Sequence, residues 1–104
     1  MSTPPSVHVR ELCLRKRRLL EELNRRDGGY TARMIDMEPV LYKKLENVDL
    51  ELSGGYYRRS FKLYVWQLSP SGYPQYIRER FEISSSDISK AADRLLEIER
   101  TVSR

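Results

Sequence analysis

Residues 47–83, NVDLELSGGYYRRSFKLYVWQLSPSGYPQYIRERFEI, decide the fold because apolar and polar side chains alternate along them in three runs. A period of two residues is that of a half-buried strand, so the stretch predicts three strands. Gly54-Gly55 separates the first two runs and Pro70-Ser71-Gly72 the last two, and both sequences suit tight hairpin turns. The stretch therefore predicts an antiparallel sheet of consecutive hairpins.

The loop Pro70-Ser71-Gly72 also predicts which residues face one another across the second hairpin. If Ser69 faces Tyr73, the numbers of every facing pair add up to 142, because 69 + 73 = 142. The predicted core pairs are Phe61–Phe81 and Val65–Ile77. The predicted pairs on the polar side are Lys62–Arg80, Tyr64–Arg78 and Trp66–Tyr76. A two-residue turn at Gly54-Gly55 likewise places Arg58 opposite Glu51.

One helix is predicted before these strands in the sequence and one after them. Residues 7–26 contain no glycine or proline, place leucines about every 3.6 residues, and stop at Asp27-Gly28-Gly29. The serines of 84–86, any of which suits a helix cap, precede a second apolar stripe over about 87–101. That stripe should cover the side of the sheet that carries the predicted core pairs.

Residues 30–46 leave two alternatives open. Thr31 to Met37 suits a strand, and Pro39 suits the first turn of a short helix. The fold class predicted is therefore α+β: an N-terminal helix, an antiparallel sheet of three strands, or four if this segment adds one, and a C-terminal helix packed on one face. Residues 1–6 are expected to be a disordered lead, and 7–104 a single domain.

The sequence offers no marker of catalysis or of metal binding. Cys13 is the only cysteine and His8 the only histidine, so an internal disulfide, a four-ligand zinc site and a histidine-based catalytic triad all lack the residues that they need. We expect a protein that is not an enzyme and has no cofactor. The apolar runs are too short to span a membrane and no signal peptide is evident, which predicts a cytoplasmic protein, or a nuclear one in a eukaryote.

Positive charge is concentrated in two segments. The net charge is +4, and residues 1–26 alone hold seven Arg or Lys against three acids. Residues 52–80 hold five bases against one acid. Basic patches neutralise phosphates, and aromatic rings stack on bases, so we expect a DNA or RNA partner. The expected nucleic-acid-binding residues are Arg15, Lys16, Arg17, Arg18, Arg58, Lys62, Tyr64, Trp66, Tyr76, Arg78 and Arg80.

Two further hypotheses are compatible with the same residues. Protein interfaces also favour aromatic side chains and arginine, so the chain can equally be an adaptor or small regulator that binds an acidic protein. The strand that contains Pro74 is expected at the edge of the sheet, because proline cannot donate a backbone hydrogen bond, and an open edge favours a homodimer.

Overall fold

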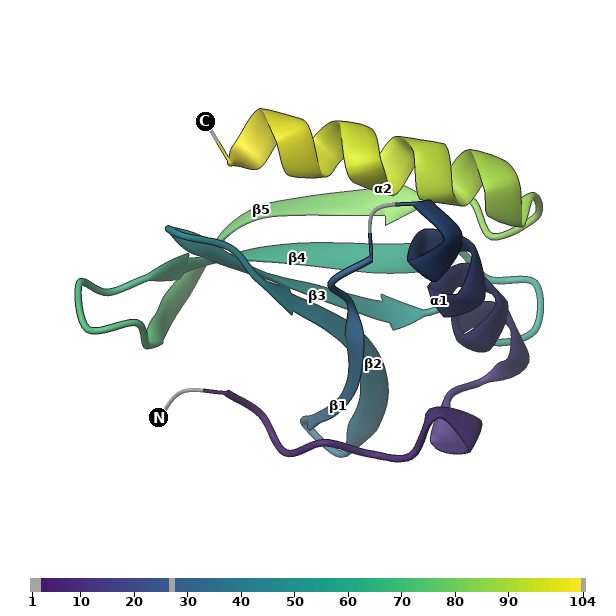
Figure 1. The fold of residues 1–104 in the computed structure, drawn as a ribbon, viewed down its shortest axis with the longest axis horizontal. Coiled ribbons are helices and arrows are strands. Elements are labelled where there is room, and N and C mark those ends of the chain that lie inside the picture. The colour runs from purple at the N-terminus through teal and green to yellow at the C-terminus, as the bar shows by residue number, and fades with distance from the viewer. Residues whose placement is uncertain (1–2, 27, 104) are drawn as a thin grey trace.

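The computed structural model describes residues 3–26 and 28–103, which form one five-stranded antiparallel sheet and two α-helices (Figure 1). Each strand pairs with the next along the chain. The strands are β1 (Thr31–Ile35), β2 (Glu38–Lys44), β3 (Val48–Gly54), β4 (Phe61–Leu68) and β5 (Pro74–Ile83). The helices are α1 (Leu14–Arg26) and α2 (Ile88–Val102), and the short 3-10 helix η1 (Val9–Glu11) precedes them.

The α+β class is confirmed, whereas the number of strands was predicted wrongly. The sheet has five strands rather than three or four, because residues 31–44 form the hairpin β1–β2. Its two-residue turn, Asp36-Met37, has φ angles of 50° and 66°. Positive φ at both central residues matches the right-handed twist of the strands, although the sequence lacks the Asn-Gly signal that usually marks such a turn.

Pro39 lies within β2 rather than at the start of a helix, and its surroundings show why a strand tolerates it. Two residues beyond the last β2–β3 pair, Leu41–Leu52, Pro39 would face Gly54. It has no N–H to offer there. The Glu38 carboxylate accepts the Gly54 N–H instead at 3.0 Å, so the backbone donor that faces the proline is satisfied.

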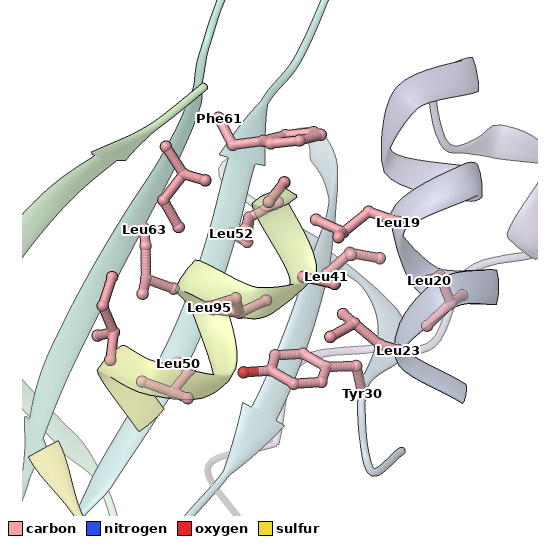
Figure 2. Packing of buried hydrophobic residues seen from close by; sticks show 14 of the residues in the cluster. Leu19, Leu20, Leu23, Tyr30, Leu41, Leu50, Leu52, Phe61, Leu63 and Leu95 are labelled. Carbon is pink, nitrogen blue, oxygen red and sulfur yellow. The ribbon is translucent and has the colours of Figure 1, made fainter. Parts of the chain in front are cut away.

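Both helices pack on the same side of the sheet and enclose the hydrophobic core (Figure 2). Leu19, Leu20 and Leu23 of α1 and Leu95 of α2 point toward the leucines of β2, β3 and β4 and toward Phe61. The prediction that the C-terminal helix covers the Phe61/Leu63/Val65 side is confirmed. Burying a leucine stabilises the fold by about 1.5–3 kcal/mol, so this cluster is the main source of stability.

The helix boundaries differ slightly from those predicted. Residues 7–13 are not part of the first α-helix, which begins at Leu14 and ends at Arg26. Gly28, at a φ of 74°, donates its N–H to the Leu23 carbonyl beyond that end, and Asp27 lies outside the described residues. The second helix is capped by Asp87, whose carboxylate accepts the Lys90 N–H, and not by one of the serines.

The two edge strands of the sheet, β1 and β5, differ in what pairs with their outer side. Along β1, the N-terminal segment adds a short stretch of pairing: Val7 donates to the Ala32 carbonyl and Met34 donates to the Pro5 carbonyl. Part of the expected disordered lead thus contacts the sheet, while residues 1 and 2 lie outside the described residues. At the opposite edge, β5 pairs with β4 alone within the sheet, as expected for the strand that contains Pro74.

Candidate functional site

The side of the sheet that the helices leave uncovered carries the predicted aromatic and basic residues of β4. Phe61, Leu63 and Val65 are buried against the helices. Because side chains alternate along a strand, those of Lys62, Tyr64 and Trp66 leave the sheet on the opposite side. We call this surface the helix-free face. Here Lys62 is exposed, whereas Tyr64 and Trp66 are partly buried.

The register of β4 against β5 was predicted wrongly by two residues over most of its length. Phe61 faces Ile83 and Leu63 faces Phe81, so both core positions meet apolar partners. The predicted register would instead have placed Leu63 opposite Glu79. Irregularities between Val65 and Trp66 and between Gln67 and Leu68 take up the difference before the loop.

This register changes which side chains lie together on the helix-free face. Arg80, not Arg78, pairs with Tyr64, and Lys62 pairs with Glu82 rather than with Arg80. The partner of Trp66 is Ile77. Tyr76 pairs with Gln67, which leaves β4 on the side opposite Trp66. Arg78 falls beside the irregularity, is exposed, and has an ion pair with Glu79 at 3.7 Å.

The β3–β4 loop is longer than the two-residue turn predicted, which removes Arg58 from the strand. Tyr56 to Arg59 form the turn, closed by a hydrogen bond from Gly55 N–H to the Ser60 carbonyl at 3.1 Å. A Cβ atom added to Gly55 would lie 2.4 Å from the Phe61 ring, so the turn requires glycine there. Glu51 therefore faces Tyr64 and not Arg58, whose side chain is exposed in the loop.

The four basic residues that open α1 do not join this surface. Lys16 is fully buried, with Nζ 2.9 Å from Glu38 Oε2, 2.6 Å from the Pro39 carbonyl and 3.1 Å from the Tyr56 hydroxyl. It anchors α1 to the sheet and is not accessible to a phosphate, contrary to its predicted role. Lys16 can occupy a position in the apolar stripe of α1 because these three partners satisfy its buried ammonium group.

The other three residues of the basic run lie on the helix side of the sheet. Arg15 donates to the Ser85 hydroxyl at 2.8 Å, and Arg17 donates to the Leu12 carbonyl at 3.4 Å. Arg18 is exposed. Since α1 covers one side of the sheet and Tyr64 and Trp66 point to the other, the two predicted halves of the binding site do not form a single surface.

A hollow of about 370 Å³ opens on the helix-free face, and several of the residues that line it were missed from the sequence. Tyr64, Trp66 and Arg80 were predicted. Glu51 and Ser53 of β3 were not, although the strand period places both on the same side as Asp49. With the correct loop length, the sequence pattern would have put them beside Tyr64 and Lys62. The lining is Ile35, Asp36, Glu38, Glu51, Ser53, Tyr64, Trp66, Ile77 and Arg80.

Buried carboxylates give this face an unusual electrostatic character. Burial raises the pKa of Glu51 above its ordinary value, and the hydrogen bond from Trp66 Nε1 to Glu51 Oε1, at 2.9 Å, offsets only part of that effect. Burial likewise raises the pKa of Asp49, against a hydrogen bond from the Tyr42 hydroxyl. The pKa of Tyr42 is strongly raised, first by burial and then by the hydrogen bond that its hydroxyl donates to Asp49.

Glu38, at the margin of the hollow, behaves in the opposite way. Burial opposes its ionisation, but hydrogen bonds from the Gly54 N–H and from Lys16 outweigh burial and lower its pKa. Its charge is therefore already neutralised within the protein. The acids of the hollow that keep capacity for an added ligand are the buried Glu51 and the exposed Asp36.

A second hollow of about 300 Å³ adjoins the first at the β5 edge. Its lining is Lys62, Tyr64, Arg80, Phe81 and Glu82. Tyr64 and Arg80, which pair across β4 and β5, line both hollows and form a ridge between them. An aromatic ring and a guanidinium group thus stand between two neighbouring depressions.

Comparison of the chain with models of protein families, with curated proteins and with solved structures finds no match in any of the three. Over 3–26 and 28–103, no group of three or more His, Cys, Asp or Glu side chains is arranged to hold a metal ion. No helix within the same ranges combines the length and the apolarity that crossing a membrane requires. The chemistry of the helix-free face is that of aromatic stacking, cationic contact and carboxylate hydrogen bonding.

Proposed function

We propose that this protein binds single-stranded nucleic acid on the helix-free face of its sheet. The observation that carries the proposal is the Tyr64–Arg80 ridge, which lies between two hollows and beside Trp66. Unpaired bases stack on aromatic rings at about 1–3 kcal/mol each, whatever their sequence. A guanidinium group beside the stacking ring can bind the phosphate that links two bases.

Unpaired positive charge on this face supports the proposal, although Arg18 of α1 is also exposed and without a partner among the described residues. Lys62, Arg80 and the loop residue Arg58 are exposed and have no ion pair or hydrogen bond among the described residues. Arg15 is instead bound to Ser85 and Lys16 to Glu38. Cations that lack an internal partner are those free to replace the counterions of a phosphate chain.

The shape of the face favours a single strand over a duplex. Two hollows of about 370 and 300 Å³ accept bases that project from a flexible chain, whereas a duplex keeps its bases stacked inside. The carboxylates of Asp49 and Glu51 lie on the same face and disfavour the close, continuous phosphate contact that duplex binding requires.

Fluorescence anisotropy with labelled single- and double-stranded DNA and RNA of equal length, across a salt series, tests the proposal. Trp66 is the only tryptophan, so its emission reports directly on the ridge. We expect binding of single strands at low salt, weakening as salt rises, with quenching of Trp66. Binding that leaves Trp66 unchanged would exclude this face, and the absence of binding at low salt would exclude nucleic acid as the ligand.

A second candidate function is protein association through β5. This ten-residue strand is the open edge of the sheet, and most of its side chains are exposed. If two copies paired antiparallel with Phe81 opposite Phe81, Arg80 of each would face Glu82 of the other, so the edge is complementary to itself. Sedimentation equilibrium over a range of protein concentrations tests this homodimer. A molecular mass that stays at 12.3 kDa throughout would exclude it.

A further inference from the structure

Two polar side chains of the first hollow are almost fully buried and keep hydrogen-bonding capacity unused. Glu51 is 8% exposed, and its Oε1 accepts the Trp66 indole N–H. Its Oε2 has no partner among the described residues. Ser53 is 6% exposed, and its hydroxyl has no partner among these residues either. Both line the hollow.

Glu51 Oε2 and Ser53 Oγ are not among the fully enclosed polar atoms that lack a partner, so both reach the space of the hollow. A ligand there can supply the hydrogen bonds that the protein does not provide. Glu51 and Ser53 are two residues apart on one strand, so they lie on the same side of the sheet, about 7 Å apart along β3. The hollow therefore presents the Glu51 carboxylate as an acceptor and the Ser53 hydroxyl as a donor. The side chains of Tyr64 and Trp66 line the same hollow.

We infer that this hollow binds a guanine base, with Glu51 and Ser53 reading its Watson–Crick edge and Tyr64 and Trp66 contacting its ring. The inference rests on the proposed binding of single strands and assigns them a preferred base. Guanine alone among the common bases offers two adjacent N–H donors, at N1 and N2, which suit a carboxylate. Next to them is the O6 acceptor, which suits the Ser53 hydroxyl.

The other bases match this arrangement less well. Adenine and cytosine each place a ring nitrogen acceptor beside their amino group, and that acceptor would face the Glu51 carboxylate. Uracil and thymine offer one N–H between two carbonyl oxygens, so one carboxylate oxygen would meet a carbonyl. The hollow, at about 370 Å³, is near the lower limit of about 300 Å³ for ligand pockets, which suits one base rather than several.

An organic cation is the main alternative ligand for a carboxylate between aromatic walls. Two features of the lining disfavour it. The guanidinium group of Arg80 stands at the same hollow, and its charge repels a second cation. The Glu38 carboxylate is already bound to Lys16 and to Gly54 N–H, so Asp36 at the exposed margin is the one other lining acid that could assist Glu51 in holding a cation.

The experiment compares three ten-residue DNA strands: all thymidine, thymidine with one central guanosine, and thymidine with one central inosine, which lacks the N2 amino group. Anisotropy is measured for each strand at one salt concentration. We expect the guanosine strand to bind about 5- to 150-fold more tightly than the thymidine strand, which is the discrimination of a good bidentate contact. The inosine strand should bind with intermediate affinity.

Protein variants locate this preference. Glu51→Gln should reduce the ratio between the guanosine and thymidine strands to near one, while the affinity for the thymidine strand changes by less than about threefold. Ser53→Ala should lower the ratio in part. The matched control is Glu46→Gln, which neutralises an exposed acid between β2 and β3, outside both hollows, and should leave the ratio unchanged.

The outcomes separate this inference from the proposed function. Equal binding of all three strands would overturn the guanine site and leave single-strand binding intact. No binding of any strand would overturn both. A cation ligand would give a different pair of results. Agmatine would quench Trp66 emission in the wild type but not in Glu51→Gln, and no strand would be preferred for its guanosine. The inosine comparison needs no change to the protein, so it decides the matter even if Glu51→Gln does not fold.

Discussion

Two basic regions of the molecule, the start of α1 and the β4–β5 surface, carry similar charge and use it differently. In α1, Lys16 is buried against Glu38 and Arg15 is held by Ser85. On β4 and β5, Lys62 and Arg80 remain exposed, although each has a cross-strand neighbour. The comparison teaches that a cluster of positive charge indicates a ligand only where the fold has not already provided its partner.

The largest effect should come from removing the internal cation. Lys16→Met leaves Glu38, the Pro39 carbonyl and the Tyr56 hydroxyl without their shared partner. We expect a loss of about 3 kcal/mol in the free energy of unfolding, at the low end for a buried pair because the Glu38 side chain keeps 33% of its surface exposed. Urea denaturation followed by circular dichroism measures it.

The control for Lys16 is its exposed neighbour. Arg18→Ala should change the free energy of unfolding by no more than about 0.5 kcal/mol, as surface substitutions usually do. If both variants were equally stable, the contrast between the two basic regions would have no energetic basis. Adding Glu38→Gln to Lys16→Met should restore part of the lost stability, because it removes the charge left without a partner.

The next effect concerns binding rather than stability. Tyr64→Ala removes the aromatic part of the ridge and should weaken single-strand binding by about 1–3 kcal/mol. Tyr76→Ala is the matched control, because Tyr76 pairs with Gln67 and lies away from the ridge. Anisotropy titrations of both variants measure the effect. An equal loss in the two would indicate the register in which Tyr76 faces Trp66, and would contradict the one observed.

A smaller effect separates the two basic regions by their response to salt. Arg80→Gln should reduce the slope of log affinity against log salt concentration by about 0.7, the value of one phosphate contact to a single strand. Arg18→Gln should leave the slope unchanged, since α1 lies on the other side of the sheet. A change of slope in Arg18→Gln alone would move the binding surface to the helix.

The smallest effect is the dependence of stability on pH. Burial raises the pKa of Glu51 above its ordinary value of 4.5, so the folded protein holds this proton at a higher pH than the unfolded chain does. The resulting stabilisation is present below the unfolded pKa and is lost as the pH rises through the folded one. The opposite shift in Glu38 acts at lower pH: its stabilisation is lost as the pH falls through its lowered pKa.

Thermal denaturation over a pH series that starts below 4.5, the ordinary pKa of Glu51, and rises from there checks this sign. The wild-type midpoint should fall as the pH rises across the window between the unfolded and folded pKa values of Glu51. Glu51→Gln should show a smaller fall, since Asp49 is then the remaining carboxylate on this face whose pKa is raised. A variant with the same pH dependence as the wild type would show that Glu51 does not titrate differently in the folded state.

Local pattern was a good guide to some of these features and a poor guide to others. The alternation along β4 correctly assigned Lys62, Tyr64 and Trp66 to one side, because a strand admits only two directions for its side chains. The register was wrong because the irregularities after Val65 and Gln67 add residues that alternation does not reveal. Glu51 was missed as a site residue for a related reason: the β3–β4 loop is longer than its two glycines indicate.

The sequence by itself determined the α+β class, the β4 strand, the C-terminal helix and the open edge at β5, since these depend on periodicity and on proline within short windows. Only the tertiary structure decided which side of the sheet α1 covers, and with it the burial of Lys16 and the exposure of Arg80. Burial depends on contacts between residues far apart in the chain, such as Lys16 with Glu38 and Tyr56. Charge is a property of each residue, but the partner of a charge is a property of the fold.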